Sequence, residues 1–309
     1  RARQGRLHRT GWRDRLGWRV DALRAHLDDG AEGIAELLVD WVARPDRNPF
    51  FWFVNLTECH SPYLPPRPWN PLGPVDRWRA AAEASEYLTM GAIWRCSLGG
   101  FDVPDDALER MRRLYVASGA QLDAWVARVL ELLDEHGLLD ETQVVLTSDH
   151  GENLGEARLL GHSFSLDDRL LRVPLVTAGP CRLETDGILR LTQVPAFIAE
   201  AAGVSDHPFD DGLPDGVAVA ELDAPGDGNH QRCLEGVVQW HLPDGGIEAA
   251  GLMGRSMTCA TDGRLKLLRP AGTGARALEL PAELLLDLTV DPLELDPRPP
   301  SAAQEREHK

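Results

Sequence analysis

The sequence predicts an α/β domain with a largely parallel central sheet flanked by helices, followed by a small C-terminal α+β subdomain. Continuous apolar runs at 143–147 and 173–179 are typical of strands buried in parallel sheets. Segments with helical periodicity lie before and after these runs, which is the order of an α/β fold. From about residue 204 the chain changes to Gly-, Pro- and Asp-rich loops with short strand-like runs. The predicted domains are therefore residues 1–203 and 204–297, with a disordered tail at 298–309.

The first part of the chain alternates between predicted helix and strand. Residues 31–44 have helical periodicity, and "FWFVNL" at 51–56 is an aromatic, β-branched run that predicts a buried strand. Residues 76–100 predict a helix and then a loop. From 105 to 136 the apolar spacing predicts one long amphipathic helix, and Gly137 follows it as a C-terminal cap.

The later part predicts one more helix and then short strands. "LTQVPAFIAEAA" at 191–202 predicts the helix. Strand-like runs follow at 233–240, 256–263 and 264–269, and Asp262-Gly263 between the last two is a hairpin signal.

Composition excludes several classes of partner. The formal net charge of the 309 residues is -17, which opposes binding to nucleic acid because the phosphate backbone repels such a surface. No apolar run reaches the roughly 18 residues that a membrane-spanning helix needs. The five cysteines form no Cys-x-x-Cys pair, so they predict reduced thiols and favour a cytoplasmic location. They are Cys59, Cys96, Cys181, Cys233 and Cys259.

Polar residues follow two of the predicted strands. Asp149 and His150 follow the run at 143–147, and His60 follows the run at 51–56. In open parallel sheets, ligands bind outside the carboxyl ends of the strands. A carboxylate and an imidazole suit a divalent cation, and a turn at Gly151 would let both side chains converge. The alternative reading is a polar turn after a strand, with His60 and His162 as ordinary loop residues.

An ordered set of motifs resembles the sulfatase family of the alkaline phosphatase superfamily. The resemblance is carried by a set of segments in the family's order: "NPFFWFVNLTECHSPY" (48–63), "YVASGAQLDAWVARVLELLDEHGLLDETQVVLTSDHGENLGE" (115–156), "GH" (161–162), "LLRVPLVTAGP" (170–180), "TDGRLKLLR" (261–269) and "LLLDLTVDPLE" (284–294). The Ser-Asp-His-Gly-Glu run together with the Arg-Val-Pro-Leu strand is the specific part of the match.

The resemblance implies a role for each matched residue. Asp149 and His150 would bind one divalent metal ion, with calcium expected and manganese or another transition metal as the alternative. His60 would contact the sulfate or phosphate group of a small anionic ester. His162 would lie near the leaving oxygen as a cationic and catalytic group. Glu152 and Glu156 would support these residues from behind.

The resemblance also shows what the sequence lacks. The family's nucleophile is a formylglycine made within a Cys/Ser-x-Pro-x-Arg motif, and no cysteine or serine of this sequence lies in that pattern. The family's other metal-binding aspartates and an initiator Met are also missing. The hypothesis is an incomplete sulfatase fold that is inactive alone, whereas the complete protein hydrolyses a sulfate ester.

Three alternatives stay open. A phosphonate or phosphodiester hydrolase of the same superfamily would use the same residues, and the nitrogen donor of His150 suits a transition metal better than calcium. A two-metal phosphodiesterase would need an Asp-x-x-x-His cluster, but Ala127 stands where Asp123 would require the histidine. A non-catalytic remnant would explain the missing nucleophile.

Overall fold

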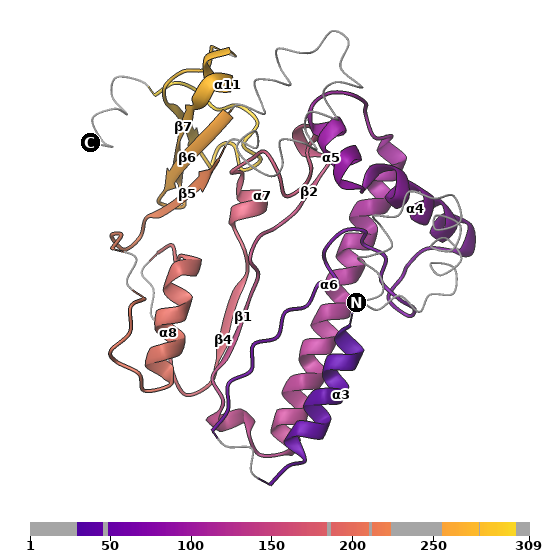
Figure 1. Cartoon of the computed structure of the whole chain (residues 1–309), viewed down its shortest axis with the longest axis vertical. Helices are drawn as coiled ribbons and strands as arrows, with labels where there is room; N and C mark the ends of the chain where they lie inside the picture. The colour runs from indigo at the N-terminus through magenta and orange to yellow at the C-terminus, as the bar shows by residue number, and fades with distance from the viewer. Residues whose placement is uncertain are drawn as a thin grey trace. The chain divides into compact units, whose positions relative to one another are not determined.

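The computed structural model describes residues 30–45, 49–183, 187–209, 212–223, 255–277 and 279–300 (Figure 1). The chain divides into two compact units. Unit 1 comprises 1–93 and 102–142, and unit 2 comprises 94–101 and 143–309. The predicted strand at 233–240, Cys233 and tail residues 301–309 lie outside the described residues. The domain boundaries at 203 and 297 stay a prediction.

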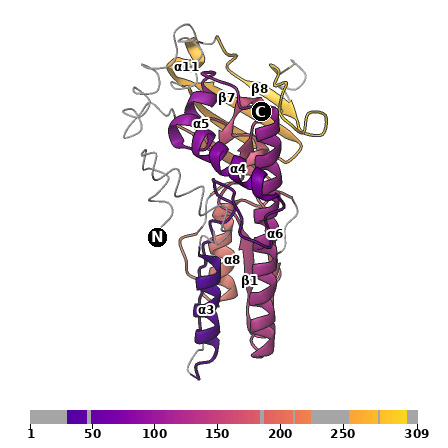
Figure 2. The same ribbon diagram turned by 90° about the vertical axis from the view of Figure 1, so that its right-hand side faces the viewer.

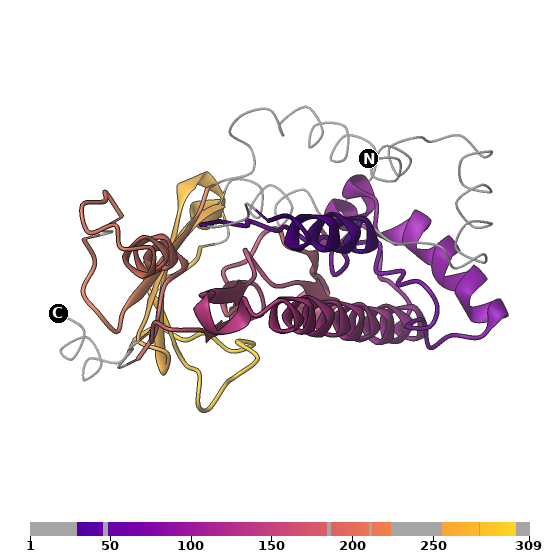
Figure 3. The ribbon, with the colours of Figure 1, turned by 90° about the horizontal axis from the view of Figure 1, so that it is seen from below.

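Unit 1 is built around the long helix α6 (Asp105–Glu135), with α3 (Ala31–Val42) alongside it (Figure 3). Both helices were predicted, and both are confirmed. α6 ends at Glu135, and Gly137 follows it as the sequence predicts. The φ of 64° at Gly137 allows the N–H of Gly137 to donate to Asp134 O and the N–H of Leu138 to donate to Leu133 O. These two bonds satisfy carbonyls at the end of the helix.

Ala31 fixes the start of α3 against the rest of unit 1. The residue before the helix is Gly30, which has no side chain to cap it, and Glu58 Oε1 accepts the Ala31 N–H at 2.9 Å instead. The indole of Trp125 on α6 donates to Ala31 O at 2.7 Å. Ala31, Ala35, Leu38 and Trp125 form one apolar cluster, so α3 packs through its buried face.

Residues 76–100 form two helices where one helix and a loop were predicted. They are α4 (Pro74–Tyr87) and α5 (Met90–Ser97). α4 lies beside α6 (Figure 2), and Arg110 on α6 forms a half-buried ion pair with Glu83 on α4. A short 3-10 helix, η1 (Leu139–Glu141), ends unit 1.

The predicted buried strand at 51–56 is wrong. These residues belong to no strand, and within the described part of the chain their backbone groups form no hydrogen bond. Phe51 and Phe53 are 70% and 84% exposed, whereas Trp52 packs edge-on against Trp41 with ring centroids 4.7 Å apart. An alternating apolar run adopts a paired strand only where a neighbouring strand supplies hydrogen bonds, and the described residues supply none here.

Unit 2 contains the two apolar strands predicted from the sequence, β1 (Val144–Thr147) and β4 (Leu175–Ala178). The mixed α/β class is confirmed. The two strands pair antiparallel, with Val144 opposite Ala178 and Thr147 opposite Leu175, so the parallel arrangement predicted for this pair is wrong. A parallel pair requires a crossover connection, usually a helix that returns the chain along the sheet. The connection here holds only short elements, namely β2 (Asn153–Leu154), η2 (Glu156–Arg158), β3 (Leu160–Gly161) and α7 (Asp168–Leu171).

The chain then forms the predicted helix and a second sheet. The helix is η3 (Leu191–Gln193) followed by α8 (Val194–Ala201). An antiparallel sheet of four strands in the order β5-β6-β7-β8 follows, and α11 (Gly272–Ala277) comes after β7. The strands are β5 (Ala218–Leu222), β6 (Arg255–Thr261), β7 (Leu265–Ala271) and β8 (Leu284–Asp287).

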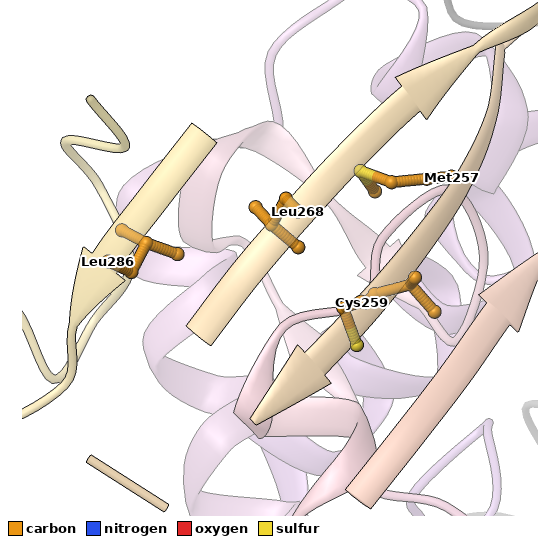
Figure 4. Packing of buried hydrophobic residues seen from close by; sticks show 5 residues of the cluster. Met257, Cys259, Leu268 and Leu286 are labelled. Atoms are coloured by element: carbon orange, nitrogen blue, oxygen red, sulfur yellow. The ribbon is translucent and has the colours of Figure 1, made fainter. Parts of the chain in front are cut away.

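The details of this sheet follow from its sequence. Asp262-Gly263 forms the predicted turn between β6 and β7, where Asp262 Oδ1 accepts the Leu265 N–H at 2.7 Å. Met257, Cys259, Leu268 and Leu286 form the buried core of one face (Figure 4). Arg298, at the start of the predicted disordered tail, forms an antiparallel bridge with Leu285, so order extends further than predicted.

Candidate functional site

The predicted metal ligands lie in the turn that follows β1. Ser148 Oγ donates to His150 O at 2.7 Å, and the backbone N–H of His150 donates to Asp149 Oδ1 at 3.0 Å. These two bonds fold the turn back on itself. They leave Asp149 Oδ2 3.8 Å from His150 Nε2, with the Asp149 side chain 83% exposed. The predicted convergence of the two donors is therefore present in the structure.

Gly151 allows this turn to pack closely. Its N–H donates to Leu170 O at 2.8 Å, and a Cβ at position 151 would lie only 1.9 Å from Arg169 O. No side chain fits at that distance. The glycine therefore fixes the turn against the chain just before β4.

The tautomer of His150 follows from its neighbours. His150 Nδ1 lies 2.8 Å from Gly151 O, and a carbonyl can only accept, so Nδ1 carries the proton. In the neutral ring Nε2 then holds a lone pair on the side of Asp149 Oδ2. A carboxylate oxygen and an imidazole nitrogen are suitable ligands for a divalent cation.

His162 lies directly against His150. The antiparallel pairing of Asn153 with Gly161, and of Leu154 with Leu160, reverses the chain between them. The two imidazole rings stack with centroids 4.2 Å apart and planes inclined by 30°. The sequence-predicted residues Asp149, His150 and His162 therefore form one cluster within unit 2.

Glu152 lies within hydrogen-bonding distance of His162 and shifts its pKa. His162 Nδ1 lies 3.2 Å from Glu152 Oε1, and the Glu152 side chain is only 3% exposed. The hydrogen bond with Glu152 raises the pKa of His162 above its ordinary value; burial opposes the rise, and the charges of Glu152 and Asp149 add to it. His162 consequently binds a second proton more readily than a free imidazole does. Glu156, the other supporting residue, accepts the Leu154 N–H through Oε2 at 2.7 Å.

His60 lies in unit 1, after the exposed segment 51–56, and its Nδ1 lies 3.0 Å from Ser61 O. Its proximity to the cluster in unit 2 stays a prediction. Sequence reasoning missed the contacts behind the turn, namely the approach of Arg169 O to Gly151 and the ion pairs of Lys266 with Asp168 and Glu294. The sequence feature that could have pointed to these ion pairs is Lys266 itself, the one internal lysine in an arginine-rich chain.

Asp149 and His150 lie close enough together to bind one metal ion. Two donors that bind one ion at about 2.0–2.5 Å lie no more than about 5 Å apart. The 3.8 Å between Asp149 Oδ2 and His150 Nε2 meets this limit. Across the described residues, no group of three or more His, Cys, Asp or Glu side chains could hold a metal ion, so Asp149 and His150 would need further ligands to complete a site. No described helix is long and apolar enough to cross a membrane.

Known proteins resemble the chain in both sequence and fold. The sequence model of the family described as "Sulfatase" matches residues 27–203. Choline-sulfatase of Rhizobium meliloti is 32% identical over 193 residues, which cover 54% of this chain and 35% of that protein. The multifunctional alkaline phosphatase superfamily protein PehA of Trinickia caryophylli is 28% identical over 148 residues, 42% of this chain and 29% of that protein. The chain thus spans about a third of the length of these relatives.

A solved structure shows the same fold. Phosphonate monoester hydrolase from Silicibacter pomeroyi superposes with a TM-score of 0.54 and 20% identity, over 90% of this chain and 58% of that one. At that identity the likeness establishes the α/β fold alone.

Proposed function

Because the chain belongs to the sulfatase family, we propose that it forms part of a metal-dependent hydrolase of sulfate esters. The observation that carries the proposal is the cluster in unit 2. Asp149 and His150 present two metal-type donors 3.8 Å apart, and His162 stacks on His150 with its Nδ1 3.2 Å from Glu152 Oε1. A small anionic ester is the substrate class that a cation and an imidazolium together would bind.

Each residue of the cluster has a distinct task. Asp149 Oδ2 and His150 Nε2 would hold the cation, and the Gly151 carbonyl orients the His150 ring through Nδ1. When bound, a divalent cation neutralises the charge of the ester oxygens. Glu152 holds Nδ1 of His162, so the imidazolium carries its second proton on Nε2, from which it can protonate the leaving alcohol. His60 would contact the sulfate group.

The proposal requires a nucleophile that this sequence does not contain. No Cys/Ser-x-Pro-x-Arg motif is present in the 309 residues. Formylglycine, with the remaining metal ligands, would come from sequence outside this chain, and residues 1–309 alone would be inactive. The chain alone and the chain joined to the protein sequence encoded upstream of it should be assayed with p-nitrophenyl sulfate and p-nitrophenyl phosphate. Equal turnover by the two proteins would refute the proposed inactivity.

Metal binding tests the cluster itself. Calorimetric titration with Mn²⁺ and Ca²⁺ should show weaker binding by D149N and H150A, by tenfold or more, because each removes one of two donors. His136→Ala is the matched control, since that exposed imidazole lies at the end of α6 and contacts Leu132 O. Unchanged affinity in D149N would remove the cluster as a metal site.

A second candidate is hydrolysis of phosphonate or phosphate esters at the same cluster. The nitrogen donor of His150 favours it, because calcium prefers oxygen ligands and manganese or another transition metal accepts imidazole. Turnover of p-nitrophenyl phenylphosphonate in excess of the sulfate, with tighter binding of Mn²⁺ than Ca²⁺, would favour this candidate.

A further inference from the structure

The one internal lysine of the chain is completely buried in the four-stranded sheet. The sequence has only two lysines, Lys266 and the terminal Lys309. Lys266 is 0% exposed on β7, which is rare for lysine. In the sheet register Lys266 lies opposite Leu286, and Leu268 two residues later lies opposite Cys259. Side chains two apart point to the same face, so the ammonium group shares the apolar face of the core.

Two carboxylates hold this ammonium group. Lys266 Nζ lies 2.8 Å from Asp168 Oδ1 and 2.9 Å from Glu294 Oε2. Burial lowers the pKa of Lys266, but the hydrogen bonds that Nζ donates to Asp168 Oδ1 and to Glu294 Oε1 outweigh burial, so the pKa is raised and the ammonium group stays charged. Glu294 also binds the backbone of the same segment, because its Oε1 accepts the Asp168 N–H at 2.5 Å. Asp168 is therefore clamped through both its side chain and its peptide.

The clamped segment is the one that supports the metal-site turn. Arg169 donates to Leu293 O at 2.7 Å and to Asn153 Oδ1 at 3.3 Å. Its own carbonyl faces Gly151, and the next carbonyl, Leu170 O, accepts the Gly151 N–H at 2.8 Å. Gly151 directly follows His150. Leu166, two residues before Asp168, packs into the apolar core of the sheet.

We propose that Lys266 and Glu294 are positioning residues, which hold the Asp149–His150 turn in register through Asp168 and the Arg169–Leu170 backbone. Neither residue touches the two donors. The C-terminal sheet therefore also keeps the Asp149–His150 turn in place. This inference rests on the proposed function only in naming that turn a metal site.

Amide hydrogen exchange of the full chain, followed by NMR, tests the connection directly. The Gly151 N–H reports the contact with Leu170 O, and the Val145 N–H in β1 serves as an internal reference. In K266M, exchange of Gly151 should accelerate at least tenfold relative to Val145. In E294Q, which keeps an acceptor for the Asp168 N–H, the acceleration should be about threefold.

Leu268→Ala is the matched control. It weakens the same sheet without touching the ion cluster, so it should leave the ratio of the Gly151 and Val145 rates unchanged. If K266M and E294Q change that ratio no more than L268A does, the lysine only stabilises the sheet and the proposal is overturned. If K266M does not fold, the ratio of the Gly151 and Val145 exchange rates in E294Q alone decides whether the proposal stands.

Mn²⁺ titration separates this inference from the proposed function. K266M should weaken Mn²⁺ binding while Asp149 and His150 are both still present. If D149N leaves Mn²⁺ affinity unchanged, the metal site fails, whereas the exchange ratio still decides whether Lys266 orders the turn.

Discussion

The four-stranded sheet of unit 2 and the extended residues 50–56 of unit 1 are both built from apolar sequence. They differ in how many of their backbone groups are hydrogen-bonded and in how many of their side chains are buried. In the sheet, β6 and β7 each have a paired neighbour on both sides, and Leu286 of β8 is only 2% exposed. In residues 50–56, Trp52 packs inward while Phe53 is 84% exposed and no described residue pairs with the backbone. Apolar alternation therefore specifies an extended backbone, whereas a sheet also requires neighbouring strands to bond with.

We expect the largest change in stability from removing the buried Lys266 of the four-stranded sheet. K266M leaves Asp168 and Glu294 without their counter-charge, and we expect a loss of about 3–5 kcal/mol in the free energy of unfolding. The folded pKa of Lys266 is raised, so its contribution is complete below the unfolded pKa of about 10.4 and is lost as pH rises through the folded pKa.

Urea unfolding of the wild type and K266M between pH 8 and pH 11.5 measures this contribution. The difference in unfolding free energy should be constant at the lower pH values and shrink at the alkaline end. R269M removes an exposed ion pair with Glu283 and should cost less than about 1 kcal/mol at every pH. A K266M difference as small as that of R269M would mean that the buried cluster adds nothing.

An intermediate effect comes from two glycines, one in each unit. Gly151→Ala would place a Cβ 1.9 Å from Arg169 O, and we expect a loss of about 1–3 kcal/mol because backbone must move. Gly119 on α6 has open space around it, so Gly119→Ala should stabilise unit 1 by up to about 1 kcal/mol. Urea titrations followed by circular dichroism compare the two. Equal responses would show that the turn at Gly151 is not closely packed.

The smallest effect on stability concerns the exposed face of residues 50–56. Phe53→Ser should change the free energy of unfolding by less than about 0.5 kcal/mol, because the ring is already in solvent. It should nevertheless reduce self-association, since an extended apolar segment whose backbone pairs with no described residue can act as a template for intermolecular pairing. Val116→Ser is the control in sedimentation velocity, because Val116 is also highly exposed, at 71%, but lies on helix α6. Identical sedimentation of both variants and the wild type would argue that this segment is not adhesive.

Sequence reasoning succeeded where the signal was local. The periodicity of α6 and its Gly137 cap, the runs of β1 and β4, and the Asp262-Gly263 turn all follow from near neighbours in the chain. Strand direction and pairing failed, because they depend on residues distant in sequence. The apolar run at 51–56 was therefore predicted as buried, although its neighbours within the described chain provide no sheet.

The same limit applies to the candidate site. The convergence of Asp149 and His150 could be predicted, because one turn contains both. The stacking of His162 on His150 depends on the pairing of two very short strands, which carry almost no periodic signal. Lys266 was invisible as a site residue because its partners Asp168 and Glu294 lie 98 and 28 residues away in sequence.

The bond from Trp125 to Ala31 makes the Trp125 indole a spectroscopic probe of the contact between α3 and α6. The indole ring is only 7% exposed, and its N–H is bound to a main-chain oxygen on the neighbouring helix. Separation of α3 from α6 would expose the indole ring and its N–H group to water, and the fluorescence emission of the ring would shift to longer wavelength. Because the sequence has nine tryptophans, the emission of Trp125 is obtained as the difference between the wild type and Trp125→Phe, and this difference follows undocking of the two helices.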